Sequence, residues 1–383
     1  MTNQVRVFDT TLRDGEQSPG ASMSINQKIE IATLLDEMKV DIIEAGFPVA
    51  SEGDFLAVSE IAKRTENSIV CALSRSNRSD IERAAEAIQS AKQSRIHTFI
   101  STSEIHMKYK LRMSEDDVLF SIDDSVTYAR NFTDDVEWSC EDGTRSDPDF
   151  LIRCFDTAIR AGATTVNIAD TVGYVLPHEF EELIKKILNN VANIDSTTFS
   201  VHCHDDLGLA TANSLTAIRS GARQIECTIN GVGERAGNAS LEEIVMALHT
   251  RKDKLDVFTQ VKTELLTDLS KMVADATGFV VSPNKAIVGE NAFAHESGIH
   301  QHGVINHRKT YEIMEPKTVG ADGSRLVFGK HSGRHALKHK LEEMDIALNT
   351  EEMGVLFEKF KNFADGQKEV SELELLNLVK DIR

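Results

Sequence analysis

The sequence is poor in cysteine, and the few that occur are not arranged for cross-linking. Only five cysteines are present among 383 residues, no two of them form a C-x-x-C pair, and most stand in apolar runs. They are Cys71, Cys140, Cys154, Cys203 and Cys227. An odd and widely spaced set argues against a disulfide framework. We therefore expect reduced thiols in a cytoplasmic protein.

Long apolar runs and an excess of positive charge are also missing. No run approaches the roughly 18 apolar residues of a membrane-spanning helix, and the N-terminus passes at once into a strand-like segment, so we expect neither a membrane span nor a signal peptide. Lysine and arginine total 42 against 61 aspartates and glutamates, and the net charge of −19 would repel nucleic acid and anionic lipid. An anionic substrate must therefore be attracted by a local cluster or a metal.

Eight short apolar segments recur, each followed by a polar or glycine-rich loop and a helix-length amphipathic stretch. They are residues 5–8, 41–45, 68–73, 95–100, 135–140, 165–169, 199–204 and 224–229. Eight alternations favour a closed TIM (β/α)8 barrel, because a doubly wound sheet usually has fewer strands. A flavodoxin-like or Rossmann sheet is the alternative, and the lack of a G-x-G-x-x-G motif at the first helix weakens it.

The strand rhythm stops after about residue 250, and the remainder indicates a mainly helical C-terminal extension. Helical patterns cover residues 261–277, 335–344, 351–364 and 372–379, the last without a capping signal. In the barrel, residues 26–38 are also amphipathic, and Ser240 is the expected N-cap of a helix over residues 241–248. We expect a barrel domain over residues 1–275, a linker subdomain over 276–330 and a helical subdomain over 331–383.

Reactive side chains come directly after the first apolar segment and at the end of the seventh. TIM barrels place their active sites at the carboxyl ends of the strands, which is where these side chains would lie. These stretches read DTTLRDGEQ (9–17) and VHCHDD (201–206). Side chains alternate along a strand, so His202 and His204 share a face, and barrel closure brings Asp14, Glu234 and Asn238 towards them. The set predicts a site for Mg²⁺, Mn²⁺ or Zn²⁺. The alternative is a pair of half-buried core histidines.

Two neighbouring features have weaker signals. Arg13 stands beside Asp14, and a permanently charged donor next to a metal would stabilise an oxyanion that develops on a carbonyl. The alternative is that Arg13 only forms a surface salt bridge with Glu16 or Asp14. The loop NGVGERAGN (230–238) is flexible enough to approach phosphate with its backbone, but glycine-rich loops are common.

With these residues in view, the chain resembles the 2-isopropylmalate synthases. They belong to a metal-dependent TIM-barrel group with homocitrate synthases, citramalate synthases and hydroxymethylglutaryl-CoA lyases. The matching stretches run almost end to end: FDTTLRDGEQ (8–17), EAGFP (44–48), RIHTFISTS (95–103), VEWSCED (136–142), NIADTVGY (167–174), VHCHDDLGLA (201–210), NGVGERAGN (230–238), NKAIVGENAFAHESGIHQ (284–301), YEIMEP (311–316) and GKHSGRHAL (329–337). The lyases typically carry a Gly-Cys-Pro loop, which is absent here and so favours condensation.

The resemblance implies roles for individual residues. The divalent cation would be bound by Asp14, His202 and His204, with Asn238 in or close to its shell, while Arg13 polarises the ketone of a 2-oxo acid. The residues that match the 2-oxo-acid pocket are His97, Ser139, Asn167 and Thr171. The expected contacts of acetyl-CoA are Gly231, Gly233 and Glu234. The resemblance is also compatible with a monovalent cation.

The implied reaction is a Claisen-type condensation of acetyl-CoA with 3-methyl-2-oxobutanoate, followed by hydrolysis of the thioester. Glu141 and the pair of His300 and Tyr311 are competing general bases, and both remain open. In the family, the segment that carries His300 and Tyr311 lies against the barrel of the partner subunit, which implies a homodimer. No counterpart of the family's leucine-sensing domain follows, so we expect this chain to be insensitive to leucine.

Two rival functions remain at this stage. The first is a sister synthase that uses pyruvate or 2-oxoglutarate, as citramalate and homocitrate synthases do. Asp205-Asp206 after the histidines resembles the isopropylmalate group more closely. The second rival is a non-catalytic regulator that binds metal or CoA. Retention of Arg13, the metal ligands and His300 argues against it. One departure from related sequences is His302, which stands where Asp is common.

Overall fold

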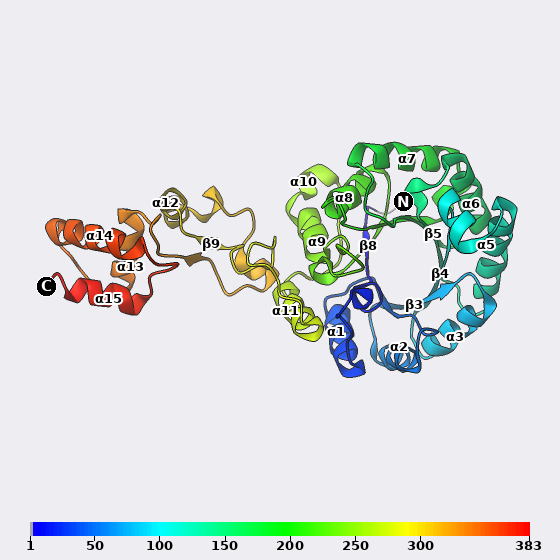
Figure 1. The fold of residues 1–383 in the computed structure, drawn as a ribbon, viewed down its shortest axis with the longest axis horizontal. Helices are drawn as coiled ribbons and strands as arrows, with labels where there is room; N and C mark the ends of the chain where they lie inside the picture. Colours follow the sequence, from blue (N-terminus) through cyan, green and yellow to red (C-terminus); the bar gives the residue numbers. More distant parts are fainter. Residues whose placement is uncertain (1–2) are drawn as a thin grey trace. The chain divides into compact units, whose positions relative to one another are not determined.

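A computed structural model describes residues 3–383, and its first part is a closed barrel of eight parallel strands. The strands are β1 (Arg6–Asp9), β2 (Ile42–Gly46), β3 (Ile69–Arg75), β4 (Ser94–Ser101), β5 (Val136–Glu141), β6 (Thr165–Asp170), β7 (Thr198–Cys203) and β8 (Gln224–Cys227). They pair in chain order, and β1 pairs with β8 to close the ring (Figure 1). This confirms the predicted TIM barrel, and each strand begins and ends within two residues of its predicted segment.

Helices surround the barrel (Figure 1). The α-helices are α1 (Ile25–Glu37), α2 (Glu52–Arg64), α3 (Arg78–Ile88), α4 (Glu104–His106), α5 (Glu115–Ala129), α6 (Pro148–Ala161), α7 (Pro177–Asn190), α8 (Ala210–Ser220), α9 (Leu241–Thr250), α10 (Lys252–Leu255) and α11 (Leu266–Thr277). The single turns are η1 (Gly15–Gln17), the π-helical η2 (Met107–Leu111), η3 (Gly143–Arg145), η4 (Ile194–Ser196) and η5 (Ile229–Gly231). No helix in the described chain is long and apolar enough to cross a membrane, and all five cysteines are buried and free.

Among three local predictions, two were wrong and one was confirmed. Residues 261–265 are not helical, because the backbone N–H of Lys262 donates to the carbonyl of Met38, and α11 begins only at Leu266. The prediction that Ser240 is the N-cap residue of a helix starting at Leu241 is confirmed by α9, although the Ser240 side chain makes no capping hydrogen bond. The last helix, α15 (Glu372–Lys380), does have a cap, since Ser371 and Glu374 form a reciprocal capping box.

The interior of the barrel contains a charge network centred on the fully buried pair of Arg95 and Glu137. Arg95 on β4 forms ion pairs with Glu137 on β5, at 2.6 Å, and with Asp135, at 3.0 Å. Gln224 on β8 accepts a hydrogen bond from Arg95 and donates two to Glu137. Burial raises the pKa of Glu137 to about 7, although Arg95 opposes the shift. Polar groups therefore tie β4, β5 and β8 together inside the ring.

The chain divides into two compact units, and the second comprises Ser282–Arg383. It contains β9 (Ala294–His295), β10 (Arg325–Leu326), α12 (Gly298–Asn306), η6 (Arg308–Thr310), η7 (Pro316–Val319), α13 (Arg334–Glu343), α14 (Thr350–Ala364) and α15. The helical predictions for residues 335–344 and 351–364 are confirmed by α13 and α14. These helices share a core that includes Leu337, Leu356 and Phe360. The predicted division of this region at residue 330 remains a prediction.

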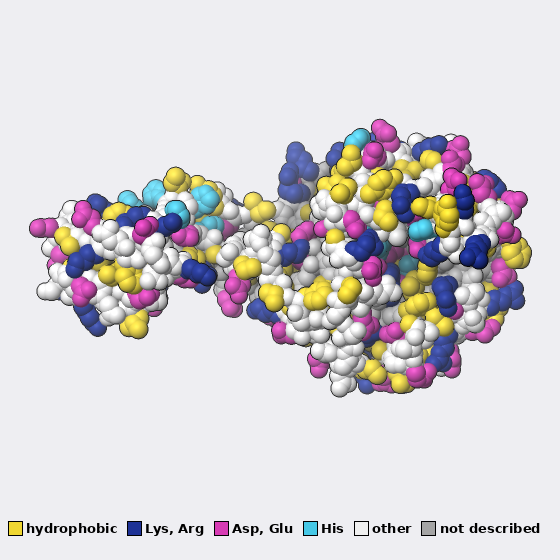
Figure 2. Space-filling view, viewed as in Figure 1, with side chains coloured by type: hydrophobic (Ala, Val, Ile, Leu, Met, Phe, Trp, Pro, Cys, Tyr) yellow, Lys and Arg dark blue, Asp and Glu magenta, His cyan; other side chains and the backbone are white. Residues whose placement is uncertain are grey.

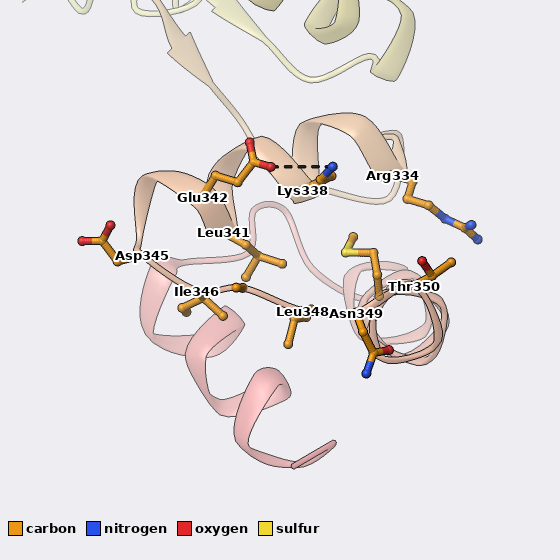
Figure 3. Close-up of a pocket in the computed structure, with 11 residues that line it drawn as sticks. Arg334, Lys338, Leu341, Glu342, Asp345, Ile346, Leu348, Asn349 and Thr350 are labelled. Atoms are coloured by element: carbon orange, nitrogen blue, oxygen red, sulfur yellow. Dashed lines mark ion pairs between the residues drawn. The ribbon is translucent and has the colours of Figure 1, made fainter.

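The second unit has a cavity of its own. A cavity of about 550 Å³ lies between α13 and the start of α14, and its side chains include the Lys338–Glu342 ion pair at 3.7 Å (Figure 3). Apolar Leu341, Ile346 and Leu348 form much of its wall. In the described chain, every cluster of three or more residues able to hold a metal lies in the barrel instead. We therefore take the barrel cavity as the candidate site.

Candidate active site

A cavity of about 350 Å³ opens where the barrel strands end. Most predicted barrel residues line it: Arg13, Asp14, His97, Ser139, Glu141, Asn167, Thr171, His202, His204 and Glu234. Strands β4, β5, β6 and β7 and the loops that follow β1, β6, β7 and β8 supply these side chains. Because parallel strands end on one rim, residues that are up to 220 positions apart meet there, as Asp14 and Glu234 do.

Asp14, His202 and His204 form a compact ligand cluster. The Nε2 atoms of the two histidines are 3.5 Å apart, and they lie 3.6 and 3.7 Å from the carboxylate oxygens of Asp14. Nitrogen and oxygen atoms of all three residues therefore lie close enough together for one divalent cation to contact each residue. The cluster therefore fits a divalent cation.

The surroundings of the cluster support the same reading. The amide of Asn238 donates to Asp14 Oδ1 at 3.1 Å, and its own oxygen is buried without a partner. On the other side, Glu226 Oε2 lies within hydrogen-bonding distance of His202 Nδ1, at 2.8 Å. This contact turns His202 Nε2 towards Asp14. A carboxylate behind a histidine is a common way to orient a metal ligand.

Electrostatics keep the Asp14 carboxylate ionised. Burial alone would raise its pKa, but Arg13, His204 and His202 outweigh burial and hold the pKa of Asp14 well below its usual value. Burial would likewise lower the pKa of His202, yet Glu226 and Asp14 raise it. The cluster is thus an anionic oxygen between two imidazoles, which is a suitable environment for a cation.

Arg13 is only slightly exposed, and its guanidinium is fixed at two points. Its Nη1 donates to Asp14 at 2.7 Å, and its Nε donates to Glu44 at 2.6 Å. Arg13 therefore does not form the surface salt bridge that the sequence also allowed, because the carboxylates of its two partners, Asp14 and Glu44, are buried. Glu44 also contacts His97 Nδ1 at 2.8 Å. This arrangement holds the guanidinium beside the ligand cluster, where it can face a developing oxyanion.

A chain of polar groups continues across the floor of the cavity. His97 Nε2 lies 2.6 Å from Ser139 Oγ, and Asn167 Nδ2 donates to the same oxygen at 2.9 Å. The side-chain oxygen of Asn167 is buried without a partner. Thr171 Oγ1 accepts from the backbone N–H of Asp142 at 2.8 Å. These groups leave donors and acceptors for a small polar substrate.

Glu141 lies at the edge of the same cavity. One of its oxygens accepts from Lys110 Nζ at 2.5 Å, and Ser101 donates to the other. Its side chain is about one fifth exposed, so it is accessible to a ligand. The other predicted base, His300, is in the second unit, where its ring stacks on Tyr311 with centroids 4.0 Å apart.

The glycine-rich loop after β8 supports the metal side of the cavity. A Cβ on Gly233 would stand 2.2 Å from Asn238 Nδ2 and 3.1 Å from Asp14 Oδ1, and one on Gly231 would meet Ser240. The backbone N–H of Glu234 donates to Asp14 Oδ1 at 3.3 Å. Glycine is therefore needed here for close approach to the ligand cluster. Contact of this loop with acetyl-CoA remains a prediction.

The sequence reasoning did not single out Glu44, Glu226 or Lys110. Both glutamates are fully buried on the barrel wall, where they orient Arg13 and His202. The available signal was a lone carboxylate within an apolar strand, since such a group must find a buried partner. Lys110 lies in the short turn η2, and no sequence pattern around it indicated a role in the cavity.

Comparison with known proteins identifies the class first. Residues 4–273 match the HMGL-like family, and residues 287–368 match the family described as homocitrate synthase post-HMGL domain-like. Among solved structures, a hydroxymethylglutaryl-CoA lyase from Pseudomonas aeruginosa has a TM-score of 0.63 at 21% identity, over 73% of this chain and 95% of that one. That likeness concerns the fold alone. Fold and cavity thus define an enzyme of the HMGL-like TIM-barrel class.

Closer relatives refine this result. A 2-isopropylmalate synthase from Aquifex aeolicus (strain VF5) is 60% identical over 380 residues, which are 99% of this chain and 73% of the relative. One from Rhodopseudomonas palustris (strain BisB18) is 58% identical over 377 residues, 98% of this chain and 72% of the relative. The chain belongs to the 2-isopropylmalate synthase family. It is therefore an acyltransferase-type enzyme, and its reaction is a condensation.

Proposed function

We propose that this protein condenses acetyl-CoA with 3-methyl-2-oxobutanoate in the barrel cavity and depends on a divalent cation held by Asp14, His202 and His204. The observation that carries the proposal is the ligand cluster, with atoms 3.5–3.7 Å apart, directly beside the slightly exposed guanidinium of Arg13. Asn238 would stand in or near the shell of the cation. The ligands are nitrogen and oxygen, so Mg²⁺, Mn²⁺ and Zn²⁺ are all suitable, with Mg²⁺ or Mn²⁺ preferred here.

When bound, the cation supplies Lewis-acid polarisation of the 2-oxo acid. The chain's own residues supply the rest. Arg13 faces the ketone oxygen and stabilises the negative charge that develops when the acetyl carbon attacks. His97, Ser139 and Asn167 orient the carboxylate and ketone by hydrogen bonding, and Thr171 lies at the rim.

The walls of the cavity favour a branched apolar 2-oxo acid. Phe47, Leu73 and Phe99 line it, and so does Ala169. An isopropyl group would bury apolar surface against them, which stabilises binding by about 0.8 kcal/mol per methylene-sized group. The second carboxylate of 2-oxoglutarate would need a cation in this wall, whereas Lys110 is already paired with Glu141. Pyruvate would leave the apolar wall partly uncovered.

For the proton transfer we favour Glu141, because it lines the same cavity as Arg13 and the ligand cluster. It would remove a methyl proton from acetyl-CoA while Lys110 and Ser101 hold its carboxylate in place. His300 with Tyr311 is the alternative base. Solvent-deuterium exchange into the methyl group of acetyl-CoA separates them. A Glu141→Gln variant should lose exchange while His300→Ala retains it, and the reverse pattern would assign the base to His300.

We also propose a cytoplasmic homodimer in which the second unit presents His300 and Tyr311 to the partner's barrel. The stacked and exposed pair is the feature that supports it. Asp14→Ala should abolish turnover and His300→Ala should lower it, and mixing the two proteins should restore part of the lost activity if sites are shared between subunits. No recovery from mixed dimers would contradict shared sites.

The reaction itself is tested by thiol release from acetyl-CoA with 3-methyl-2-oxobutanoate, pyruvate and 2-oxoglutarate, each with and without Mg²⁺ or Mn²⁺. We expect metal-dependent release that is fastest with 3-methyl-2-oxobutanoate. Faster release with another acid would change the substrate but keep the chemistry. Equal release from metal-free and metal-loaded protein would refute the role of the cation.

A further inference from the structure

A short basic segment stands on the rim of the barrel cavity. It comprises residues 106–112, His-Met-Lys-Tyr-Lys-Leu-Arg, and we call it the basic loop. It contains three permanently charged cations and no carboxylate, in a chain whose net charge is −19. Figure 2 shows Lys and Arg side chains around the hollow at the centre of the barrel. An exposed cationic segment in so acidic a protein suggests an anionic ligand.

The backbone of the basic loop is firmly held. Ser103 accepts from the N–H of His106 and donates to the buried carboxylate of Asp142, the residue that follows β5. Met107 is buried, and its carbonyl accepts from the N–H of Met113 at 3.1 Å, which closes the loop. Its centre is the π-helical turn η2, a form frequently found at functional sites. The loop therefore presents its outer side chains in a defined arrangement.

Those outer side chains are free to bind. Lys108 and Arg112 are exposed and form no ion pair with any residue that the structure describes. Tyr109 is 71% exposed, and Lys108 Nζ lies 5.2 Å from the centre of its ring. Lys110 turns inwards, where it lines the cavity and pairs with Glu141. The loop thus extends from the cavity to two unpaired cations and an uncovered aromatic ring.

We propose that the basic loop binds the adenosine 3′,5′-bisphosphate end of acetyl-CoA, with Lys108 and Arg112 contacting phosphates and Tyr109 stacking on adenine. This inference rests on the proposed function, because it places the nucleotide end of the thioester at the cavity in which the acetyl group reacts. Lysine and arginine are the usual phosphate partners, and an exposed aromatic ring is a platform for a base. The flexible arm of acetyl-CoA would then pass Lys110 into the cavity.

The glycine-rich loop after β8 is less suited to this task, because most of its backbone donors are occupied. Gly231, Val232, Gly237 and Asn238 donate their N–H groups to carbonyls within or next to the loop, and Glu234 donates to Asp14. A phosphate there would also lie close to the carboxylate of Asp14. The basic loop offers charged donors that are not yet used.

Binding is tested by calorimetric titration with CoA and with adenosine 3′,5′-bisphosphate alone. The variants are the double substitution Lys108→Gln/Arg112→Gln and the single Tyr109→Leu. The matched control, Lys252→Gln/Lys254→Gln, removes the same charge from exposed positions on α10, which follows α9 at the opposite end of the barrel. We expect the Kd of both ligands to rise about tenfold in each loop variant and to stay unchanged in the control.

Steady-state kinetics separate this site from the catalytic residues. The KM for acetyl-CoA should rise in the loop variants at nearly constant kcat. Turnover of S-acetyl-N-acetylcysteamine, which lacks the nucleotide, should equal that of the wild type. Unchanged Kd and KM in the double variant would overturn the proposal, as would an equal loss with the truncated thioester. If the wild type turns over none of the 2-oxo acids, the proposed function fails, and the bisphosphate titration still decides the binding site.

Discussion

Glu226 offers the sharpest test of how the ligand cluster is oriented. Its Oε2 lies 2.8 Å from His202 Nδ1, and both side chains are almost completely buried. In Glu226→Gln an acceptor can remain but the charge is lost, so we expect divalent metal to bind about tenfold more weakly. In Glu226→Leu the acceptor itself is lost, and about a hundredfold loss is expected, or about 2.7 kcal/mol.

The assay is calorimetric titration of Mg²⁺ or Mn²⁺ into protein that has been stripped with a chelator, with thermal unfolding recorded for each variant. Glu181→Gln serves as a control, because that carboxylate pairs with Lys185 on the exposed surface of α7 and should leave the Kd unchanged. A Kd for Glu226→Leu equal to that of the wild type would show that His202 needs no carboxylate behind it. The proposed metal site would then rest on Asp14, His202 and His204 alone, without support from the contact between Glu226 and His202.

Three further outcomes follow from buried groups. Arg95→Met should leave Glu137 buried without its ion pair and lower the free energy of unfolding by about 3–5 kcal/mol, measured by urea denaturation. Burial raises the pKa of Asp9 to about 7, so the folded state holds a proton that the unfolded state releases near pH 4. Stability should therefore fall by about 3 kcal/mol as pH rises from 4 to 7, and Asp9→Asn should flatten this dependence in urea titrations at several pH values. Gly233→Ala should push Asn238 away and weaken metal binding by about tenfold in calorimetry, whereas an unchanged Kd would show that the loop can yield.

The barrel and the ligand cluster could be predicted because each depends on a regular pattern. The period of two along β7 puts His202 and His204 on one face, and closure of the ring brings Asp14 beside them despite their separation in sequence. Neither step needs exact side-chain positions. Arg13 was harder, since its neighbours in sequence suggested a surface ion pair, whereas its actual second partner is Glu44 on the next strand.

What escaped prediction depends on contacts rather than on pattern. Glu226 occupies a strand position that an apolar residue could fill, and its purpose appears only in register with His202. Lys110 reaches Glu141 because of the π-helical turn, which no periodicity announces. The start of α11 was misjudged because Lys262 bonds to the end of α1. Long-range hydrogen bonds overrode local preference in each case.

The charge network inside the barrel also constrains how this enzyme can change over evolutionary time. Replacing Arg95 alone leaves the buried carboxylate of Glu137 without its ion pair, and replacing Glu137 alone removes one of the two ion pairs of Arg95 and two acceptors of the Gln224 amide. A route to an apolar interior would therefore have to pass through a poorly folded intermediate or change all three positions together. Strands β4, β5 and β8 should accordingly be inherited as a unit, and a designer who grafts a new cavity onto this barrel should transplant the three residues together.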